Sequence, residues 1–450
     1  LMKIILLSGG SGKRLWPLSN DSRSKQFLKL LESPNGEPES MFQRVIRQIR
    51  EAGLQDHITV ATSLSQKDII TNQLNGFQAD VVTEPSRRDT FPAIALATSY
   101  LALKKHCSRE EIIVVMPCDQ YTDLKYFETV SLMAQAAESD AAELITMGIK
   151  PTYASTKFGY IVPEENVSEN AKQPISVTRF TEKPHRPQAE TLLRQGALWN
   201  GGVFAFKLGY MIDIIQRYMT LDSFEQLYNN YTDLPKISFD YEVAERAKSV
   251  AVLLYNGAWK DLGTWNALTE ELHDNKIGNV VLGHDNTNTH VINELDQPIL
   301  CIGTKDLVVA ANTDGILVCH KNESENIKAY ADQLACRPMY EERRWGTYKV
   351  ISHVCFPDRY QALTKILCIK SGCNISYQIH RHRDEIWTFI DGTGILVLDG
   401  EVKTVQRGCT IHIKKGQLHA VKAITDLQII EVQSGDMLVE EDIERFDWEW

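Results

Sequence analysis

A run of glycines and basic residues stands near the start of the chain. It reads Ser8-Gly9-Gly10-Ser11-Gly12-Lys13-Arg14. Glycines let a backbone approach a phosphate closely, and successive N–H groups can then point at it. Lys13 and Arg14 add positive charge beside this loop, and Lys25 follows shortly after. The run therefore predicts a phosphate-binding loop, and the alternative is a flexible turn between a strand and a helix.

The glycine run matches neither of two common phosphate-binding motifs. The Walker A motif needs a glycine where Leu7 stands and a serine or threonine where Arg14 stands. The G-x-G-x-x-G motif needs a glycine where Leu15 stands. The glycine run therefore supports phosphate binding only through its composition, and the flexible turn stays open as the alternative.

A second concentration of reactive side chains lies near the other end of the chain. Four of the twelve histidines fall within it, namely His380, His382, His412 and His419. If His380 and His382 lie on a strand, their side chains point to the same face. With Glu385 nearby, the group offers the imidazole and carboxylate ligands that suit a divalent transition metal. The alternatives are a polar surface strand and a barrel without metal that serves assembly.

Elements that could position the first group alternate along the first 270 residues. Strands are expected at Ile4–Leu7, Ile58–Ala61, Ile112–Met116 and Leu144–Ile149. Helices are expected near 40–53, 65–75, 91–105 and 125–138. This alternation predicts a Rossmann-like α/β domain with a mostly parallel sheet. Ligands of such sheets bind at the carboxyl ends of strands, which are the loops after Leu7 and after Met116.

The pattern changes after about residue 275. Short β-branched runs between Asn279 and Lys321 predict a small, solenoid-like β-structure, followed by an amphipathic helix around 323–335. Closely spaced strands after 340 predict a small antiparallel barrel or sandwich. Three domains are expected, at 1–275, 276–338 and 339–450, of which the middle one is a β-rich connection.

Composition excludes several classes of protein. The 450 residues carry a net charge of −11, which disfavours a general nucleic-acid binder. No apolar run approaches the length of a membrane-spanning helix. Nine scattered cysteines without a C-x-x-C pair favour a reducing cytoplasm over a disulfide framework. We also expect a homo-oligomer, with a dimer favoured.

A series of motifs in the first 270 residues resembles the signature of sugar-1-phosphate nucleotidylyltransferases, most closely the mannose-1-phosphate guanylyltransferases. In chain order they are Gly9–Ser19, Ser24–Leu28, Glu84–Thr90, Pro92–Ala97, Phe158–Ile161, Phe180–Pro184, Trp199–Phe204 and Trp259–Trp265. Any one of these motifs is weak on its own, whereas all of them in the family's order form a specific signal. The resemblance implies attack of a sugar 1-phosphate, here mannose 1-phosphate, on the α-phosphorus of GTP.

The resemblance also implies roles for single residues. Arg14 and Lys25 would act on the triphosphate, together with a nucleotide loop formed by Gly9, Gly10, Gly12 and Lys13. The sugar phosphate would meet Gly159, Glu182, Lys183 and Asn200. Asp119 and Asp261 would form a magnesium pair, since Mg²⁺ needs only one or two protein carboxylates beside phosphate oxygens and water.

Two residues depart from the family pattern. Gln120 follows Asp119 where the family commonly has histidine, and Asp89 stands where it commonly has asparagine. A carboxylate only accepts hydrogen bonds, so Asp89 changes the contacts available at this point. A related nucleotidylyltransferase that uses another base or sugar is therefore the alternative function.

The C-terminal histidines resemble the two cupin motifs, whose barrels hold a metal with three histidines and one glutamate. The matching residues are His380, His382, Glu385 and His419, with Gln378 as an alternative ligand. The whole unit resembles the mannose-6-phosphate isomerase domain that is fused to bacterial mannose-1-phosphate guanylyltransferases. It departs at Ile386, where that family has histidine. The resemblance implies a divalent transition metal such as Zn²⁺ and a second, isomerase activity, which in one alternative is the main activity of the chain.

Overall fold

The computed structural model describes residues 2–10, 12–165, 172–334 and 337–450. The chain forms two compact units. The first unit holds the residues up to Gly12, then Ser24–Lys67 and Gly76–His273. The second unit holds Lys13–Arg23, Asp68–Asn75 and Asp274–Trp450.

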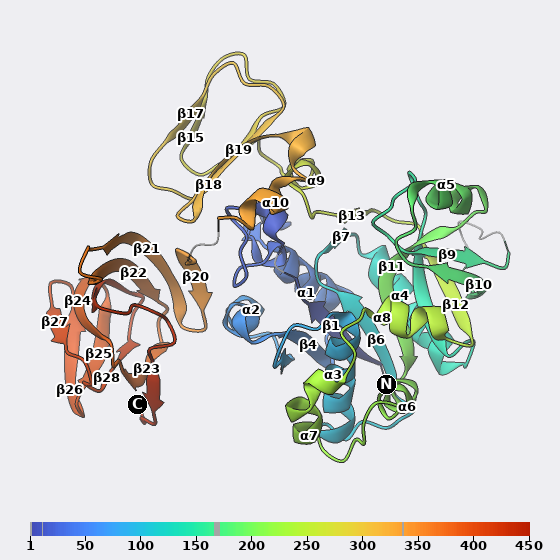
Figure 1. Cartoon of the computed structure of the whole chain (residues 1–450), viewed down its shortest axis with the longest axis horizontal. Coiled ribbons are helices and arrows are strands. Elements are labelled where there is room, and N and C mark those ends of the chain that lie inside the picture. Colours follow the sequence, from blue (N-terminus) through green and yellow to red (C-terminus); the bar gives the residue numbers. More distant parts are fainter. Residues whose placement is uncertain (1, 11, 166–171, 335–336) are drawn as a thin grey trace. The chain divides into compact units, whose positions relative to one another are not determined.

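The first unit is built on one mixed β-sheet (Figure 1). Its strands, in spatial order, are β5 (Asp80–Glu84), β4 (Ile58–Ser63), β1 (Met2–Ser8), β6 (Ile112–Pro117), β11 (Leu198–Lys207), β8 (Leu144–Ile149), β12 (Val250–Tyr255), β10 (Ile175–Thr181) and β9 (Tyr160–Pro163). The first four run parallel, as expected, and β8 and β12 form a second parallel pair. The long strand β11 runs antiparallel between these two groups.

Burial of both sheet faces explains why these strands are almost continuously apolar. Every residue of β4 and of β8 is buried, and so are four consecutive residues of β1. Strands with helices on both faces need no alternation of polar and apolar residues. Helix α3 (Thr90–Leu103) packs on β1, β4 and β5, whereas α4 (Lys125–Glu138) packs on β6, β8, β11 and β12.

Local signals set the helix ends. Ser40 and Gln43 form a capping box at the start of α1 (Met41–Glu51), and Asp89 caps α3. The remaining helices are α2 (Lys67–Leu74), α5 (Arg186–Arg194), α6 (Leu208–Ile215), α7 (Phe224–Asn229), α8 (Phe239–Glu242) and α9 (Trp265–Thr269). The short strands are β2 (Leu31–Glu32) with β3 (Pro38–Glu39), and β7 (Gln120–Thr122) with β13 (Trp259–Asp261). No helix among the described residues is both long and apolar enough to cross a membrane.

The second unit begins with a small coil of stacked short strands. One sheet contains β14 (Lys276–Ile277), β16 (His290–Asn293), β18 (Leu307–Asn312) and β19 (Gly315–His320), and another pairs β15 (Val280–Leu282) with β17 (Ile299–Cys301). All pairs except β18–β19 are parallel, as in a solenoid. The helix expected around 323–335 is shorter, because only α10 (Ile327–Ala331) is α-helical after a 3₁₀ turn, and residue 335 lies outside the described chain.

The rest of the second unit is a barrel of two antiparallel sheets. The first contains β20 (Tyr340–Arg343), β21 (Gly346–Cys355), β22 (Gln361–Ile369), β29 (Leu427–Gly435), β24 (Arg383–Asp391) and β27 (Thr410–Ile413). The second contains β26 (Glu401–Gln406), β25 (Thr393–Leu398), β28 (His419–Ala423), β23 (Asn374–Ile379) and β30 (Glu444–Phe446). Trp387, Phe389, Leu396 and Ile429 are buried in the core between them.

Two early segments of the sequence belong to this second unit. Arg23 forms a two-pronged ion pair with Glu294, with nitrogen–oxygen distances of 2.8 and 2.9 Å. The Arg23 side chain is only 7% exposed. Asn20 donates to Asp314 at 2.9 Å, and Asn312 donates to the carbonyl of Pro17. These contacts integrate Lys13–Arg23 with the coil.

Candidate functional site

A cavity of about 480 Å³ opens at the carboxyl ends of β1, β4, β5 and β6. This volume lies within the range of small-molecule sites. Its lining includes Gly9, Gly10, Glu84, Arg88, Asp89, Thr90, Asp119 and Asp240. Parallel strands place their ligand sites at this edge, so the sheet topology accounts for the position.

The glycine loop forms one wall of this cavity. Gly10 and Gly12 have positive φ angles of 85° and 60°, which glycine adopts at no steric cost. A Cβ at Gly12 would lie 2.8 Å from the backbone nitrogen of Lys25, so the chain can approach there only as glycine. Lys13 and Arg14 lie in a 3₁₀ turn of the second unit, where the Lys13 ammonium pairs with Asp332 at 3.1 Å.

The two predicted metal carboxylates meet at one ammonium group. Lys25 Nζ lies 2.9 Å from Asp119 Oδ2 and 2.8 Å from Asp261 Oδ1. Burial lowers the pKa of Lys25, but the two carboxylates outweigh it and hold the pKa above its ordinary value. Two carboxylates within reach of one atom, both partly exposed, are the hard oxygen ligands that Mg²⁺ prefers.

A short ribbon of two strands brings these carboxylates together. In β7 and β13, Gln120 lies directly opposite Asp261. The Gln120 side chain donates to the carbonyl of Gly201 at 2.7 Å and accepts from the Tyr126 hydroxyl at 3.1 Å. The glutamine that departs from the family pattern therefore ties the ribbon to β11 and α4.

Asp89, the other departure, has a structural role. Its carboxylate accepts a hydrogen bond from the Thr90 backbone at 2.7 Å at the start of α3. Its backbone has φ +75° and ψ −177°, which lies outside the left-handed helical region that aspartate often adopts and in a region that residues other than glycine seldom occupy. Because one carboxylate oxygen caps the helix, the other is left for the cavity that Asp89 lines.

A second polar group, the Glu182 cluster, consists of Gly159, Glu182, Lys183, Asn200 and Asp240. Lys183 Nζ pairs with Glu182 Oε1 at 2.8 Å. The other oxygen, Oε2, is buried and makes no hydrogen bond to the described residues. A Cβ at Gly159 would lie 2.4 Å from this oxygen. The four predicted residues therefore come together around one acceptor that a ligand hydroxyl can satisfy.

Sequence reasoning missed Asp240. Its carboxylate accepts from Asn200 Nδ2 at 2.6 Å, while Asn200 Oδ1 accepts from the Gly202 backbone at 3.1 Å. Burial and then the charge of Glu182 raise the pKa of Asp240 to about 6. The neighbouring acid and amide thus fix the orientation of Asn200. No local pattern indicates this contact, because it joins the start of a four-residue helix to the early part of β11.

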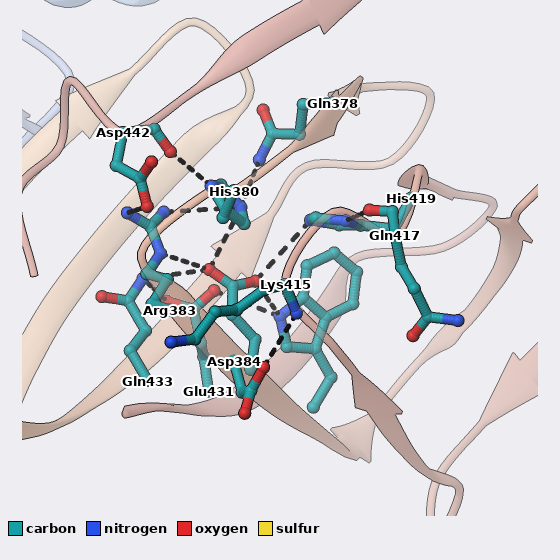
Figure 2. Close-up of polar contacts among 12 residues, drawn as sticks. Gln378, His380, Arg383, Asp384, Lys415, Gln417, His419, Glu431, Gln433 and Asp442 are labelled. Atoms are coloured by element: carbon teal, nitrogen blue, oxygen red, sulfur yellow. Dashed lines mark hydrogen bonds and ion pairs between the residues drawn. The ribbon is translucent and has the colours of Figure 1, made fainter. Parts of the chain in front are cut away.

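A third polar group, the barrel centre, lies between the two sheets of the barrel and contains His380, Glu385 and His419. Figure 2 shows the two histidines with their polar neighbours. His380 Nε2 lies 3.2 Å from Glu385 Oε1, and His419 Nε2 lies 3.7 Å from Glu385 Oε2. All three side chains are at most 2% exposed. One ligand atom from each lies within 4.8 Å of the others, which is close enough for one shared metal ion.

The hydrogen bonds of the two imidazoles place a lone pair on each nitrogen that faces Glu385. On His380 this nitrogen also lies 3.3 Å from Gln378 Nε2 and 3.4 Å from Arg383 Nη2. His380 Nδ1 lies 2.5 Å from the carbonyl of Asp442, and His419 Nδ1 lies 3.0 Å from the carbonyl of Gln417. Donation from Nδ1 leaves a lone pair on each Nε2. His419 Nε2 is buried without a hydrogen bond to the described residues. Burial lowers the pKa of His380, which favours the neutral, metal-binding form.

The structure corrects one of the four predicted metal ligands. Residues 380–382 form a turn between β23 and β24, so the alternation expected on a strand does not apply. His382 is exposed and lies outside the cluster. The alternative ligand, Gln378, is buried, with its Nε2 3.3 Å from His380 Nε2. His412 lies outside this centre as well, opposite Ile386 on β27.

The barrel centre contains three further polar residues, of which sequence reasoning missed Glu431 and Gln433. Glu431 and Gln433 continue the inward face of β29 that starts at Leu427. Gln433 donates to Glu385 and to Glu431, at 3.3 and 2.9 Å. Arg383 is buried and donates to Glu385 at 2.8 Å. Glu431 and Gln433 stand at every second position, in phase with the buried apolar residues of β29. Polar residues at such inward-facing positions were the signal that could have revealed them.

Comparison with known proteins finds two family models along the chain. A family model described as nucleotidyl transferase matches residues 3–276, and one described as mannose-6-phosphate isomerase C-terminal matches residues 333–448. The chain is 30% identical to a mannose-1-phosphate guanylyltransferase of Escherichia coli K12, covering 98% of this chain and 97% of that one. It is 31% identical to a protein of the same name from Salmonella montevideo, with 98% of each chain covered.

Similarity to a solved structure supports the fold. One match is to a crystal structure from Thermus thermophilus, described as mannose-1-phosphate geranyltransferase, with a TM-score of 0.59 and 28% identity. It covers 74% of this chain and 99% of that chain.

The barrel centre generates a test that requires no assay of activity. We expect His380→Ala and His419→Ala each to reduce divalent metal retention by about tenfold or more, because each removes a buried imidazole ligand. His382→Ala, the matched control, should retain metal like wild type, since His382 is exposed. Elemental analysis after loading with zinc, iron, manganese or nickel measures this. Equal loss in all three variants would contradict the assignment.

Proposed function

This chain belongs to the nucleotidyl transferase family, and we propose that it makes GDP-mannose from GTP and mannose 1-phosphate, releasing pyrophosphate. The single observation that carries this proposal is the pairing of two carboxylates, Asp119 and Asp261, at Lys25. Relatives over nearly the whole chain, named mannose-1-phosphate guanylyltransferases, support the substrates.

The reaction forms one phosphate–oxygen bond and breaks another. An oxygen of the sugar 1-phosphate attacks the α-phosphorus of GTP, and pyrophosphate leaves with the electron pair. Such a transfer depends on positioning and charge stabilisation rather than on a protein nucleophile. Asp119 and Asp261 would hold magnesium, which supplies neutralisation of the phosphate charge when bound.

The protein residues divide between the two substrates in this proposal. The loop of Gly9 and Gly10 presents backbone N–H groups to the triphosphate, with Lys25 as its cation. A role of Arg14 toward the triphosphate stays a prediction from the sequence. Lys183 binds the phosphate of the sugar phosphate. Glu182 Oε2 accepts from a sugar hydroxyl, since it is buried without a partner among the described side chains. Asn200 binds a second hydroxyl.

We propose a second activity, mannose-6-phosphate isomerisation, for the barrel. The observation that favours it is the buried set of His380, Glu385 and His419. Ile386, which replaces a histidine of the family, is 40% exposed on the opposite face of β24 from Glu385. This departure therefore lies away from the barrel centre. A divalent transition metal held there would polarise a sugar carbonyl, and Arg383 would orient the anionic substrate.

The proposed setting is the cytoplasm. The eight cysteines among the described residues are free thiols, which supports a reducing compartment.

Pyrophosphate release tests the transferase function. With magnesium, GTP and mannose 1-phosphate, the wild type should release pyrophosphate. Asp119→Asn and Asp261→Asn should each lower kcat by about 100-fold or more, because each removes a carboxylate of the metal pair. Asp140→Asn is the matched control, since Asp140 is exposed on the surface and pairs with Lys207. Preference for CTP or UTP would overturn only the substrate assignment, whereas no release with any pair would overturn the function.

Removing the Lys183 cation and removing the Arg14 cation should impair the use of different substrates. Lys183→Ala should raise the KM for mannose 1-phosphate, and Arg14→Ala should impair use of GTP. Loss of a charge-assisted hydrogen bond costs about 1.5–3 kcal/mol, or roughly 10- to 100-fold. Lys125→Ala, at an exposed position of α4, is the control. Steady-state kinetics with each substrate varied in turn measures the split, and equal defects toward both substrates would show that the division of roles is mistaken.

Gly159 offers a steric test of the Glu182 cluster. Gly159→Ala places a methyl group against Glu182 Oε2, so the carboxylate must move. The KM for mannose 1-phosphate should rise by about tenfold or more, because small displacements of a positioning group are costly. The KM for GTP and the melting temperature should change little. An unchanged KM for the sugar phosphate would remove Glu182 from the sugar subsite.

A further inference from the structure

The side chains of the barrel centre are closed off from solvent. Glu385, Gln433 and His419 are each at most 1% exposed, and Arg383 is 3% exposed. A sugar phosphate, the substrate proposed for this centre, can reach buried side chains only if the part of the chain that covers them moves.

The segment Met437–Glu441, here called the strap, lies against the barrel centre. It joins β29 to β30 and forms neither helix nor strand. The carbonyl of Val439 accepts a hydrogen bond from the buried Arg383 guanidinium at 2.9 Å, and Leu438 packs into the barrel core. The side chains of Met437 and Val439 are exposed instead. Little apolar surface therefore holds the strap on the barrel.

Both ends of the strap are fixed to the barrel. Before it, the carbonyl of Asp436 accepts a hydrogen bond from the Gln361 side chain at 3.2 Å. After it, the Asp442 carboxylate accepts from the backbone N–H groups of Arg381 and His382 at 2.9 and 3.1 Å. The strap can therefore lift between two fixed points while the strands beside it stay paired.

One carboxylate of the strap pairs with two cations. Glu440 Oε1 lies 2.6 Å from Lys365 Nζ and 2.7 Å from Arg337 Nη2. Lys365 lies on the inward face of β22 and its side chain is 3% exposed, whereas that of Glu440 is 28% exposed. Burial raises the pKa of Glu440, but Lys365 and then Arg337 outweigh it and hold the pKa at about 2. Glu440 is therefore an ionised group that reaches from the strap to a buried cation.

The two cations form a site that suits a phosphate group. Lysine and arginine donate charge-assisted hydrogen bonds to carboxylates and phosphates alike. A phosphate carries more negative charge than a carboxylate and offers three acceptor oxygens. Arg383 donates to both Val439 and Glu385, so it links the strap with the proposed metal ligands. Glu431, whose carboxylate lies 4.0 Å from Lys365, belongs to β29 and stays in place when the strap moves.

We propose that the strap is a lid over the barrel centre, and that Glu440 occupies the position of the substrate phosphate while the lid is closed. This inference rests on the proposed isomerase function. An incoming sugar phosphate displaces the Glu440 carboxylate from Lys365 and Arg337, so the strap lifts and the barrel centre opens. Without that phosphate, the two ion pairs keep the lid closed and exclude water from the buried polar groups.

The KM for mannose 6-phosphate tests the role of Glu440. Glu440→Gln removes the charge and keeps an oxygen that can accept from Lys365. We expect the KM to fall by about tenfold, because the phosphate no longer has to displace a carboxylate. Adding Arg337→Gln to this variant should raise the KM again by about tenfold, since it removes one cation of the phosphate site. Glu441→Gln is the matched control, because Glu441 is exposed in the same strap, and it should keep the wild-type KM.

Hydrogen exchange follows the lid itself and needs no isomerisation. In the full wild-type chain, inorganic phosphate should speed exchange of the amides of residues 437–441, whereas chloride at the same ionic strength should not. In Glu440→Gln these amides should exchange rapidly without phosphate. Exchange that phosphate leaves unchanged would overturn the lid, and so would an unchanged or raised KM in Glu440→Gln. If the strap responds to phosphate but the wild type does not isomerise mannose 6-phosphate, the lid stands and only the isomerase proposal fails.

Discussion

The ammonium group of Lys25 is the point at which three distant parts of the first unit meet. Asp119 comes from the loop after β6, Asp261 from the end of β13, and Lys25 from the segment packed behind the glycine loop. Two like charges this close are tolerated because a cation lies between them. The pairing of β7 with β13 places the carboxylates there, and the tight contact at Gly12 places the lysine. The geometry of these loops and the compensation of their charges are therefore one constraint, at the edge of the sheet where Asp119 also lines the cavity.

Regular elements are predictable from local patterns, because burial on both faces leaves an unmistakable apolar run. The runs at Ile112–Met116 and Leu144–Ile149 match the strands nearly to the residue. The antiparallel insertion of β11 is not predictable in this way, since strand order follows long-range packing rather than local pattern. The residues of the candidate sites are likewise predictable only where a local motif marks them. Motif residues such as Glu182 and Asn200 come together as expected, whereas Asp240 escapes prediction because its partner Asn200 is 40 residues away.

His382 shows the opposite error. The H-x-H spacing predicts two ligands on one face only if both histidines lie on a strand. Strand β23 ends just before them, at Ile379. The change from strand to turn at this point leaves the His382 side chain exposed at the surface, outside the barrel centre. Gln378, on the strand itself, is buried beside His380 instead. Periodic sequence patterns therefore predict which side chains share a face inside a strand or a helix. They fail at the ends of these elements, where the backbone changes direction.

The contact between Arg23 and Glu294 has a consequence for how this chain could be divided or recombined. Arg23 lies early in the sequence, yet its guanidinium is buried against a carboxylate that comes after the entire first unit. A fragment ending near residue 275 would keep the arginine and lose its counter-ion, at a cost on the order of 3 kcal/mol. A chimera that takes the coil from one relative and the transferase from another would have to exchange Lys13–Arg23 as well. A gene fusion or recombinant that exchanges the coil must therefore exchange two separate stretches of the sequence together.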